Sequence, residues 1–324
     1  MTNPLLDDLS FPPVAICLPT SAYWYDDGVI DPNADPLNLD VKPIGILAEQ
    51  NCRDPWLLAS GKAIPRIVRE VCPSILLPEE LAEVDIEAIL LATRLASYGD
   101  SMKLTHKCQN KDVDDNGDGE VCGEENDLDL NIQEFITRYD QIRNLDDYVV
   151  QLQAVAHTVY LRPTPYKQSL RVLKQAVMAE KTFNSFEDMS AEDFVMDSSK
   201  INDYSQLADL TSEVTVESIV ESIHYVTTVK GDKVFDKETI REWLLAMHTD
   251  ESKLIIAKMN ELAGELRQRS EVKYNCHACG FENKFMLEMD PQRLFMRAED
   301  SEQPKKPSPK SKNIKTKKKR RLVK

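Results

Sequence analysis

Glycine is scarce in this chain, with 10 residues in 324, and no group of them resembles a phosphate-binding loop. Dinucleotide fingerprints and phosphate loops need glycine clusters, because only glycine lets the backbone come close to a phosphate. The low glycine content therefore argues against nucleotide chemistry.

Long apolar runs are also missing, since no stretch approaches the roughly 18 residues of a membrane-spanning helix. The opening MTNPLLDDLS carries two acids and no Lys or Arg, whereas a secretory signal begins with a basic region. We therefore expect a protein without a membrane span that remains in a reducing cytosol.

Catalytic signatures are absent as well. The sequence has no G-x-S-x-G or H-E-x-x-H motif, and its 5 histidines are scattered without the neighbours of a catalytic triad. Acidic residues are so numerous that no pair stands out as a glycosidase pair. We expect a protein that is not an enzyme.

The charge is distributed unevenly. Lys and Arg number 40 against 55 Asp and Glu, a net charge of -15, but 11 of the cations lie in the last 22 residues, which contain no acid. Residues 1–302 therefore carry 29 positive against 55 negative charges, or -26. The tail has too few apolar residues to offset the entropy of ordering, so we expect it to be disordered.

The length fits two modest domains or one elaborated one. Residues 14–30 favour an extended segment, and residues 148–161 alternate like a strand hairpin. Apolar residues recur at helical spacing in several segments, and Tyr98-Gly99 is a natural stop for the second of them. The segments predicted to be helical are 55–71, 78–95, 131–143, 165–183, 204–226, 237–248 and 250–269. The predicted fold class is α+β, mainly helical.

The 7 cysteines fall into two groups. Three are isolated and read as small buried hydrophobic residues, namely Cys17, Cys52 and Cys72. The other group contains a repeated motif, because C-G-x-E-N followed by alternating apolar residues occurs at 122–126 and again at 279–283. Each copy is typical of a zinc knuckle, a turn with two cysteines that leads into a strand.

The second knuckle is compact, with Cys276 and Cys279 separated by two residues, whereas the first has Cys108 and Cys122 separated by an enlarged loop of 13 residues. Four thiolates complete a tetrahedral structural zinc site, so the two knuckles together predict one zinc-ribbon-like module. The alternative is four ordinary reduced thiols. His106 and His277 are possible substitute ligands, but we expect them at the surface.

A single site would make residues 123–275 an insertion whose two ends are joined by metal, and removing the metal would loosen the molecule. The predicted organisation then has five parts. They are an N-terminal α+β region at 1–105, the first knuckle with its acidic loop at 106–130, a mainly helical insertion at 131–268, the second knuckle at 269–298 and a disordered basic tail at 299–324.

The enlarged loop also fits the oxygen-ligand spacing of an EF-hand calcium loop. Glu125 argues against calcium, because it recurs as Glu282 in the other knuckle, where no acidic loop precedes it. Cys122 also lies inside the motif, and a solvated acidic hairpin remains the alternative. The candidate calcium positions are Asp114, Asn116, Asp118, Gly119, Glu120, Val121 and Glu125.

The order of several motifs resembles a known family. L-P-T-S-A-Y-W-Y-D-D-G-V-I at 18–30, D-x-x-x-I-L-L-A-T-R-x-A-S-Y-G at 85–99 and D-P-x-x-L-F at 290–295 are similar to stretches of the T-even-type phage baseplate hub proteins. That family includes a hub subunit and a hub assembly factor. The chain departs from the pattern at 19–22, which lacks a glycine, in the enlarged first knuckle and in the basic tail.

This resemblance implies a structural or assembly protein of the baseplate hub of a contractile-tailed bacteriophage, a late viral protein that acts through protein contacts. It implies other hub or tail proteins, or the tape measure protein, as partners. The expected location is the host cytoplasm during assembly and the tail baseplate of the virion. The alternative is a nucleic-acid-binding zinc ribbon that uses the basic tail. Residues 1–302, with a net charge of -26, would however repel phosphate.

The Ser97-Tyr98-Gly99 segment allows two interpretations. It is either a helix C-cap with an aromatic anchor or a segment that a partner recognises.

Overall fold

The computed structural model of the chain describes residues 11–110, 122–139, 142, 144–184 and 211–295. The predicted disordered tail lies outside these residues. Within them, no helix is long and apolar enough to cross a membrane.

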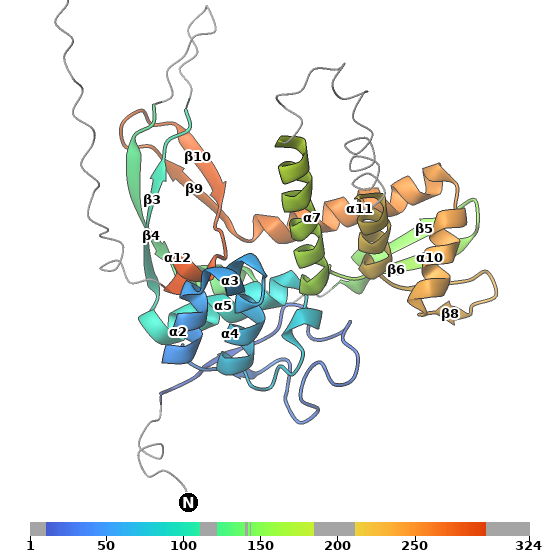
Figure 1. Cartoon of the computed structure of the whole chain (residues 1–324), viewed down its shortest axis with the longest axis horizontal. Coiled ribbons are helices and arrows are strands. Elements are labelled where there is room, and N and C mark those ends of the chain that lie inside the picture. Colours follow the sequence, from blue (N-terminus) through green and yellow to red (C-terminus); the bar gives the residue numbers. More distant parts are fainter. Residues whose placement is uncertain (1–10, 111–121, 140–141, 143, 185–210, 296–324) are drawn as a thin grey trace, which may run out of the picture.

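The described chain contains helices and strands in an α+β arrangement, which confirms the predicted fold class (Figure 1). An unlabelled helix spans 211–222. The helices are α2 (Ile46–Arg53), α3 (Pro55–Ala59), α4 (Ala63–Val71), η1 (Pro78–Glu80), α5 (Glu83–Tyr98), α6 (Ile132–Arg138), η2 (Leu145–Tyr148), α7 (Tyr166–Asn184), α10 (Lys237–Ala246), α11 (Thr249–Gln268) and α12 (Pro291–Phe295). The strands are β1 (Val14–Ile16), β2 (Leu39–Val41), β3 (Ser101–Lys107), β4 (Glu125–Asn131), β5 (Val149–Leu152), β6 (His157–Leu161), β7 (Ile223–Thr227), β8 (Lys233–Val234), β9 (Glu271–Asn275) and β10 (Glu282–Met286).

Helix α5 is the centre of the first hydrophobic core. Its middle residues are apolar on every side, and Ile89, Leu90 and Leu91 are fully buried. A helix that is apolar all round must be covered on all faces, and α4, α6, α12 and the β1–β2 pair supply that cover. Helix α2 belongs to the same core and packs on α4 and α12. Each such side chain stabilises the fold by about 1.5–3 kcal/mol. We call this part the helical body.

A buried carboxylate fastens the N-terminal segment to α5. Asp85 is fully buried and accepts hydrogen bonds from the backbone N–H of Thr20 at 3.0 Å, from the Thr20 hydroxyl at 2.5 Å and from the Tyr25 hydroxyl. The Tyr25 oxygen in turn accepts from the N–H of Ala82 at 2.8 Å. The first two motifs of the family resemblance therefore meet at one carboxylate.

The C-terminal end of α5 holds the last described segment. The Arg94 guanidinium donates to the carbonyl of Leu294 at 2.6 Å and to that of Ser101 at 3.3 Å. The Tyr98 hydroxyl donates to the carbonyl of Phe295 at 3.0 Å, and Arg94 lies 4.8 Å from the Tyr98 ring. This end of α5 thus binds the D-P-x-x-L-F stretch, about 200 residues further along the chain.

Helix α5 stops at Gly99, as predicted. Gly99 has φ 83°, and its N–H donates to the carbonyl of Leu95 at 3.1 Å. The Ser97 hydroxyl accepts from the N–H of Ile44 at 2.8 Å. Ser97 and Tyr98 are therefore engaged within the chain, which favours the C-cap interpretation over recognition by a partner.

A second hydrophobic core lies in a four-stranded antiparallel sheet, in the order β5-β6-β7-β8 (Figure 1). The inward residues of the strands, such as Leu152, Val159 and Ile223, pack with Ile240 of α10 and Ile255 of α11. We call this part the sheet lobe. It lies within the segment predicted as a mainly helical insertion, of which only the β5–β6 hairpin had been predicted as strand.

Four helix predictions need correction. The predicted helix over 78–95 is α5, which begins at Glu83 and ends at Tyr98, because Pro78–Glu80 forms the short helix η1 and Leu81 and Ala82 are extended. The predicted helix over 55–71 is two helices, because Asp54 caps α3 and a turn at Gly61, with φ 71°, separates it from α4. The predicted helix over 204–226 ends at 222 in the described residues. Ile223–Thr227 is strand β7 instead, since its aromatic and β-branched residues pair with β6. Helix α6 covers only Ile132–Arg138 of the predicted 131–143.

Other predictions are confirmed. Helices α10 and α11 lie where the apolar spacing placed them, and the Asp236 carboxylate caps α10 by accepting from the N–H of Thr239 at 2.9 Å. Of the isolated cysteines, Cys52 and Cys72 are buried, whereas Cys17 is half-buried.

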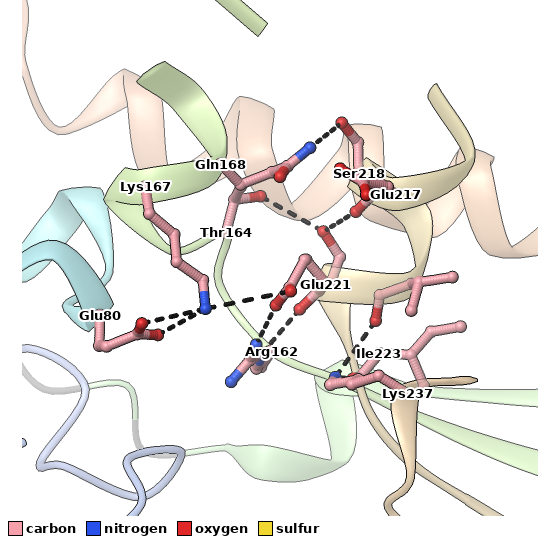
Figure 2. Close-up of polar contacts among 12 residues, drawn as sticks. Glu80, Arg162, Thr164, Lys167, Gln168, Glu217, Ser218, Glu221, Ile223 and Lys237 are labelled. Carbon is pink, nitrogen blue, oxygen red and sulfur yellow. Dashed lines mark hydrogen bonds and ion pairs between the residues drawn. The ribbon is translucent and has the colours of Figure 1, made fainter. Parts of the chain in front are cut away.

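Ion pairs join the sheet lobe to the helical body (Figure 2). The Arg162 guanidinium pairs with the Glu221 carboxylate at 2.6 Å, and both side chains are more than four-fifths buried. The Lys167 ammonium lies 2.8 Å from Glu80 of the helical body and 4.0 Å from Glu221 of the sheet lobe. Trp24, from the N-terminal segment, also packs against Tyr148 of the lobe, with 5.0 Å between ring centroids.

Asp85 makes the stability of the fold depend on pH. Burial raises the pKa of Asp85 to about 6, against about 3.9 in an unfolded chain. Asp85 therefore adds to the free energy of unfolding below pH 4, and this contribution is lost as the pH rises through 6. Relative to Asp85→Asn, the unmodified protein should lose about 1 kcal/mol of unfolding free energy between pH 5 and pH 7.5, measured by denaturant titration. Parallel pH profiles for the two proteins would contradict this assignment.

Candidate metal centre

Two antiparallel hairpins stand side by side on the helical body (Figure 1). Strand β3 pairs with β4, and β9 pairs with β10. Cys108 follows β3 and Cys122 precedes β4, whereas Cys276 follows β9 and Cys279 precedes β10. Each predicted knuckle therefore lies at the turn end of a two-stranded hairpin.

The two knuckles have the same backbone hydrogen bonds. The N–H of Cys108 donates to the carbonyl of Glu124 at 2.9 Å, and the N–H of Gly123 donates to the carbonyl of Cys108 at 3.2 Å. In the second knuckle, the N–H of Cys276 donates to Phe281 and the N–H of Gly280 donates to Cys276, both at 2.9 Å.

A glycine follows the second cysteine of each knuckle, and both glycines have positive φ, 64° at Gly123 and 73° at Gly280. The repeated glycine is thus a conformational requirement of the turn.

The four predicted cysteines come together. Their Sγ atoms all lie within 4.8 Å of one another, and those of Cys108 and Cys279 are 3.6 Å apart. A tetrahedral zinc site with bonds of about 2.3 Å would separate its sulfurs by about 3.8 Å, whereas a disulfide needs about 2.05 Å. All four cysteines are free thiols in the structure. The spacing therefore suits a metal ion held by four sulfurs.

Two asparagines connect the knuckles reciprocally. The Asn126 side chain donates to Cys276 Sγ at 3.6 Å and accepts from the N–H of His277 at 2.9 Å. The Asn283 side chain donates to Cys108 Sγ at 3.4 Å and accepts from the N–H of Gln109 at 2.9 Å. Each asparagine belongs to one knuckle and binds the first cysteine of the other.

Both asparagines are nearly fully buried, so these contacts are shielded from water. The sequence shows them as the last residue of each C-G-x-E-N copy, but a repeat alone does not reveal that its side chain crosses to the other hairpin.

The surroundings of two of the thiols, Cys276 and Cys122, shift their pKa values in opposite directions. Backbone N–H donation, mainly from Cys279, lowers the pKa of Cys276 to about 6. At Cys122 the N–H of Glu124 lowers the pKa, but burial and hydrogen bonds with the other three thiols outweigh it and raise the pKa to about 12. A bound cation would stabilise all four thiolates together.

Neither histidine joins the four sulfurs. His277 is exposed, as expected, and its Nε2 lies 3.3 Å from Glu124. His106 differs from the expectation, because it is half-buried between the hairpins. Its ring stacks on Phe285 at 4.1 Å, and its Nδ1 is hydrogen-bonded to the Tyr274 hydroxyl at 2.8 Å. His106 therefore helps to pack one hairpin against the other.

The candidate calcium loop lies mostly outside the described residues, which include only Glu125 of its positions. The Glu125 carboxylate pairs with Lys107 at 3.5 Å, and Glu282 pairs with Lys284 at the same distance. Both glutamates thus form surface ion pairs, Glu125 across its hairpin and Glu282 along its own strand. Calcium binding stays a prediction.

The fold and this centre define an α+β protein in which two hairpins, distant in sequence, meet at a cluster of four cysteines. A family model described as T4 bacteriophage base plate protein matches residues 53–296, about three quarters of the chain. The chain belongs to this family of phage baseplate proteins. No curated protein and no solved structure matches it.

The matched range includes α5, both knuckles and the D-P-x-x-L-F stretch. The N-terminal motif at 18–30 lies outside it, but Thr20 and Tyr25 of that motif bind Asp85 inside it. The three motifs of the family resemblance, at 18–30, 85–99 and 290–295, therefore meet at α5.

The turn at Gly280 gives a direct stability test. Gly280 has φ 73° with open space around it, so Gly280→Ala should destabilise the protein by about 1–2 kcal/mol through backbone strain alone. Gly264 in α11 also has open space but lies in a helix, so Gly264→Ala should stabilise by up to about 1 kcal/mol. Denaturant unfolding of both variants measures the difference, and equal effects would refute the assigned turn.

Proposed function

We propose that this protein is a structural or assembly component of the baseplate hub of a contractile-tailed bacteriophage, and that it carries one structural zinc. The observation that carries the proposal is the match to the baseplate family over residues 53–296, together with the four clustered cysteines inside that range. The assignment to the hub rests on the motifs at 18–30, 85–99 and 290–295.

The proposed metal ligands are Cys108, Cys122, Cys276 and Cys279. Four thiolates suit zinc, and they fill a tetrahedral coordination sphere without leaving a position for a reactive water. The asparagine and backbone donors around the sulfurs resemble the outer contacts that orient metal ligands. The zinc then closes a loop of more than 150 residues and contributes to stability rather than to a reaction.

The proposed mechanism is the presentation of surfaces to other proteins. The proposed partners are other hub or tail proteins, including the tape measure protein, first in the host cytoplasm and then in the tail baseplate. Nothing in this mechanism requires catalysis. The five-part division of the chain, with a metal-closed insertion between the knuckles, is part of the same proposal.

The zinc content can be measured by elemental analysis. The purified chain should hold about one zinc, and Cys276→Ser should release it because three sulfurs leave the sphere open. Cys17→Ser, which changes a cysteine outside the cluster, should retain it. Asn126→Ala and Asn283→Ala should each weaken zinc binding by about 10–100-fold in a chelator competition. Full metal content in Cys276→Ser would rule out the four-cysteine site.

Co-expression tests the proposed role. The chain should co-elute in size-exclusion chromatography with hub or tape measure proteins of the same phage, and Cys276→Ser should reduce the complex while Cys17→Ser preserves it. The alternative, a nucleic-acid-binding protein, predicts instead that the chain binds DNA or RNA. Salt-resistant binding of either by a chain without residues 303–324, with no protein complex, would overturn the proposal.

A further inference from the structure

A basic groove lies between helices α4 and α7, away from the cysteine cluster. It is a cavity of about 400 Å³ in which cations predominate, and it includes one acid, Glu79. We call it the α4–α7 groove. Its six cationic side chains are those of Lys62, Arg66, Arg69, Lys167, Arg171 and Lys174.

This charge is unusual for the chain. Residues 1–302 carry a net charge of -26, so six cations around one groove run against the charge of the body. Like charges placed together repel, so a cluster of six is stabilised when anions lie beside it. Acids of this chain or of a partner therefore stabilise the groove.

Half of these cations have acidic neighbours in the chain. Arg69 pairs with Glu79 at 3.2 Å, and Arg171 pairs with Glu217 at 2.6 Å. Lys167 pairs with Glu80 at 2.8 Å, in the cluster that joins the sheet lobe to the helical body (Figure 2).

The other three cations are exposed, and none of them has an ion pair among the described residues. They are Lys62, Arg66 and Lys174. These three side chains are the ones left to meet an external acid.

The shape of the groove is fixed by packing. The turn between α3 and α4 packs closely against α7 at Gly61. A Cβ atom on Gly61 would lie 2.3 Å from the side chain of Leu170. The Tyr166 hydroxyl reaches the carbonyl of Gly61 at 3.5 Å. The two walls are thus held at close range by a residue that must be glycine.

An exposed aromatic side chain borders the cations. Trp56 is 62% exposed, and its ring lies 5.1 Å from the Lys62 ammonium. Pro65 and Leu170 add apolar lining inside the groove itself. Trp and Arg placed together are typical of protein interfaces.

We propose that the α4–α7 groove binds an acidic segment of another protein, with apolar residues spaced among its acids. Surface ion pairs contribute little each, so the apolar contacts supply much of the affinity while the cations steer the encounter and select an acidic partner. A long nucleic acid fits less well, because its phosphates would also face the acidic remainder of the body. The inference rests on the proposed function and extends it, because it specifies that one protein partner presents an acidic segment.

The test uses the purified full-length chain and two fluorescent probes. One is a synthetic peptide of Glu with Leu at every fourth position, and the other is a single-stranded oligonucleotide of equal charge. The groove variant carries Lys62→Glu, Arg66→Glu and Lys174→Glu. The control variant carries Lys230→Glu, Lys253→Glu and Lys284→Glu, which change the net charge equally outside the groove. Thermal melting and zinc content verify that both variants fold.

The groove variant should bind the peptide at least about tenfold more weakly, whereas the control should change binding by less than about twofold. Replacing Leu by Ser in the peptide should weaken binding to the unmodified protein by about threefold or more. Equal losses in the two variants, or indifference to the Leu residues, would overturn the proposal. Tighter, groove-dependent binding of the oligonucleotide would replace it with a nucleic-acid site.

These outcomes are independent of the hub complex, because the probes are synthetic. If the unmodified chain forms the hub complex but does not bind the peptide, the groove proposal alone is refuted. If it binds the peptide in a groove-dependent way but forms no hub complex, the hub assignment alone is refuted.

Discussion

The contact between the two knuckle hairpins determines how the chain closes on itself. Asn126 and Asn283 each bind the first cysteine of the opposite hairpin, so the four sulfurs lie within 4.8 Å. The chain between β4 and β9, which includes the whole sheet lobe, is a long segment whose two ends meet at this contact. Helix α11 runs from the lobe back to the second hairpin, and Leu266 near its end packs against both hydrophobic cores (Figure 1).

Helix α5 organises the rest of the body in a similar way. Its N-terminal end holds the entry segment through Asp85, and its C-terminal end holds the last described segment through Arg94 and Tyr98. Removing one partner of a buried hydrogen bond costs more free energy than the bond contributes, because the other partner is left unpaired. The contacts of Asp85, Arg94 and Tyr98 therefore oppose any shift of the two segments along α5.

Local patterns predicted much of the secondary structure and the ligand set. Periodicity located α5, α10 and α11, and turn chemistry located the stop at Gly99 and the cap at Asp236. Strand β7 escaped prediction because its pairing with β6 joins residues about 65 positions apart, and no local window contains that partner. The α4–α7 groove escaped for the same reason, since its cations come from two segments that look like ordinary solvated helix faces.

The sequence by itself determined which residues form the cysteine cluster, because a repeated motif and the ligand count of a tetrahedral site need no knowledge of the fold. It also determined the family resemblance and the division of charge between body and tail. Only the tertiary structure decided that each asparagine crosses to the other hairpin, that His106 packs between the hairpins, and that Asp85 is fully buried. These facts depend on contacts between distant segments, and such contacts arise from packing the whole chain.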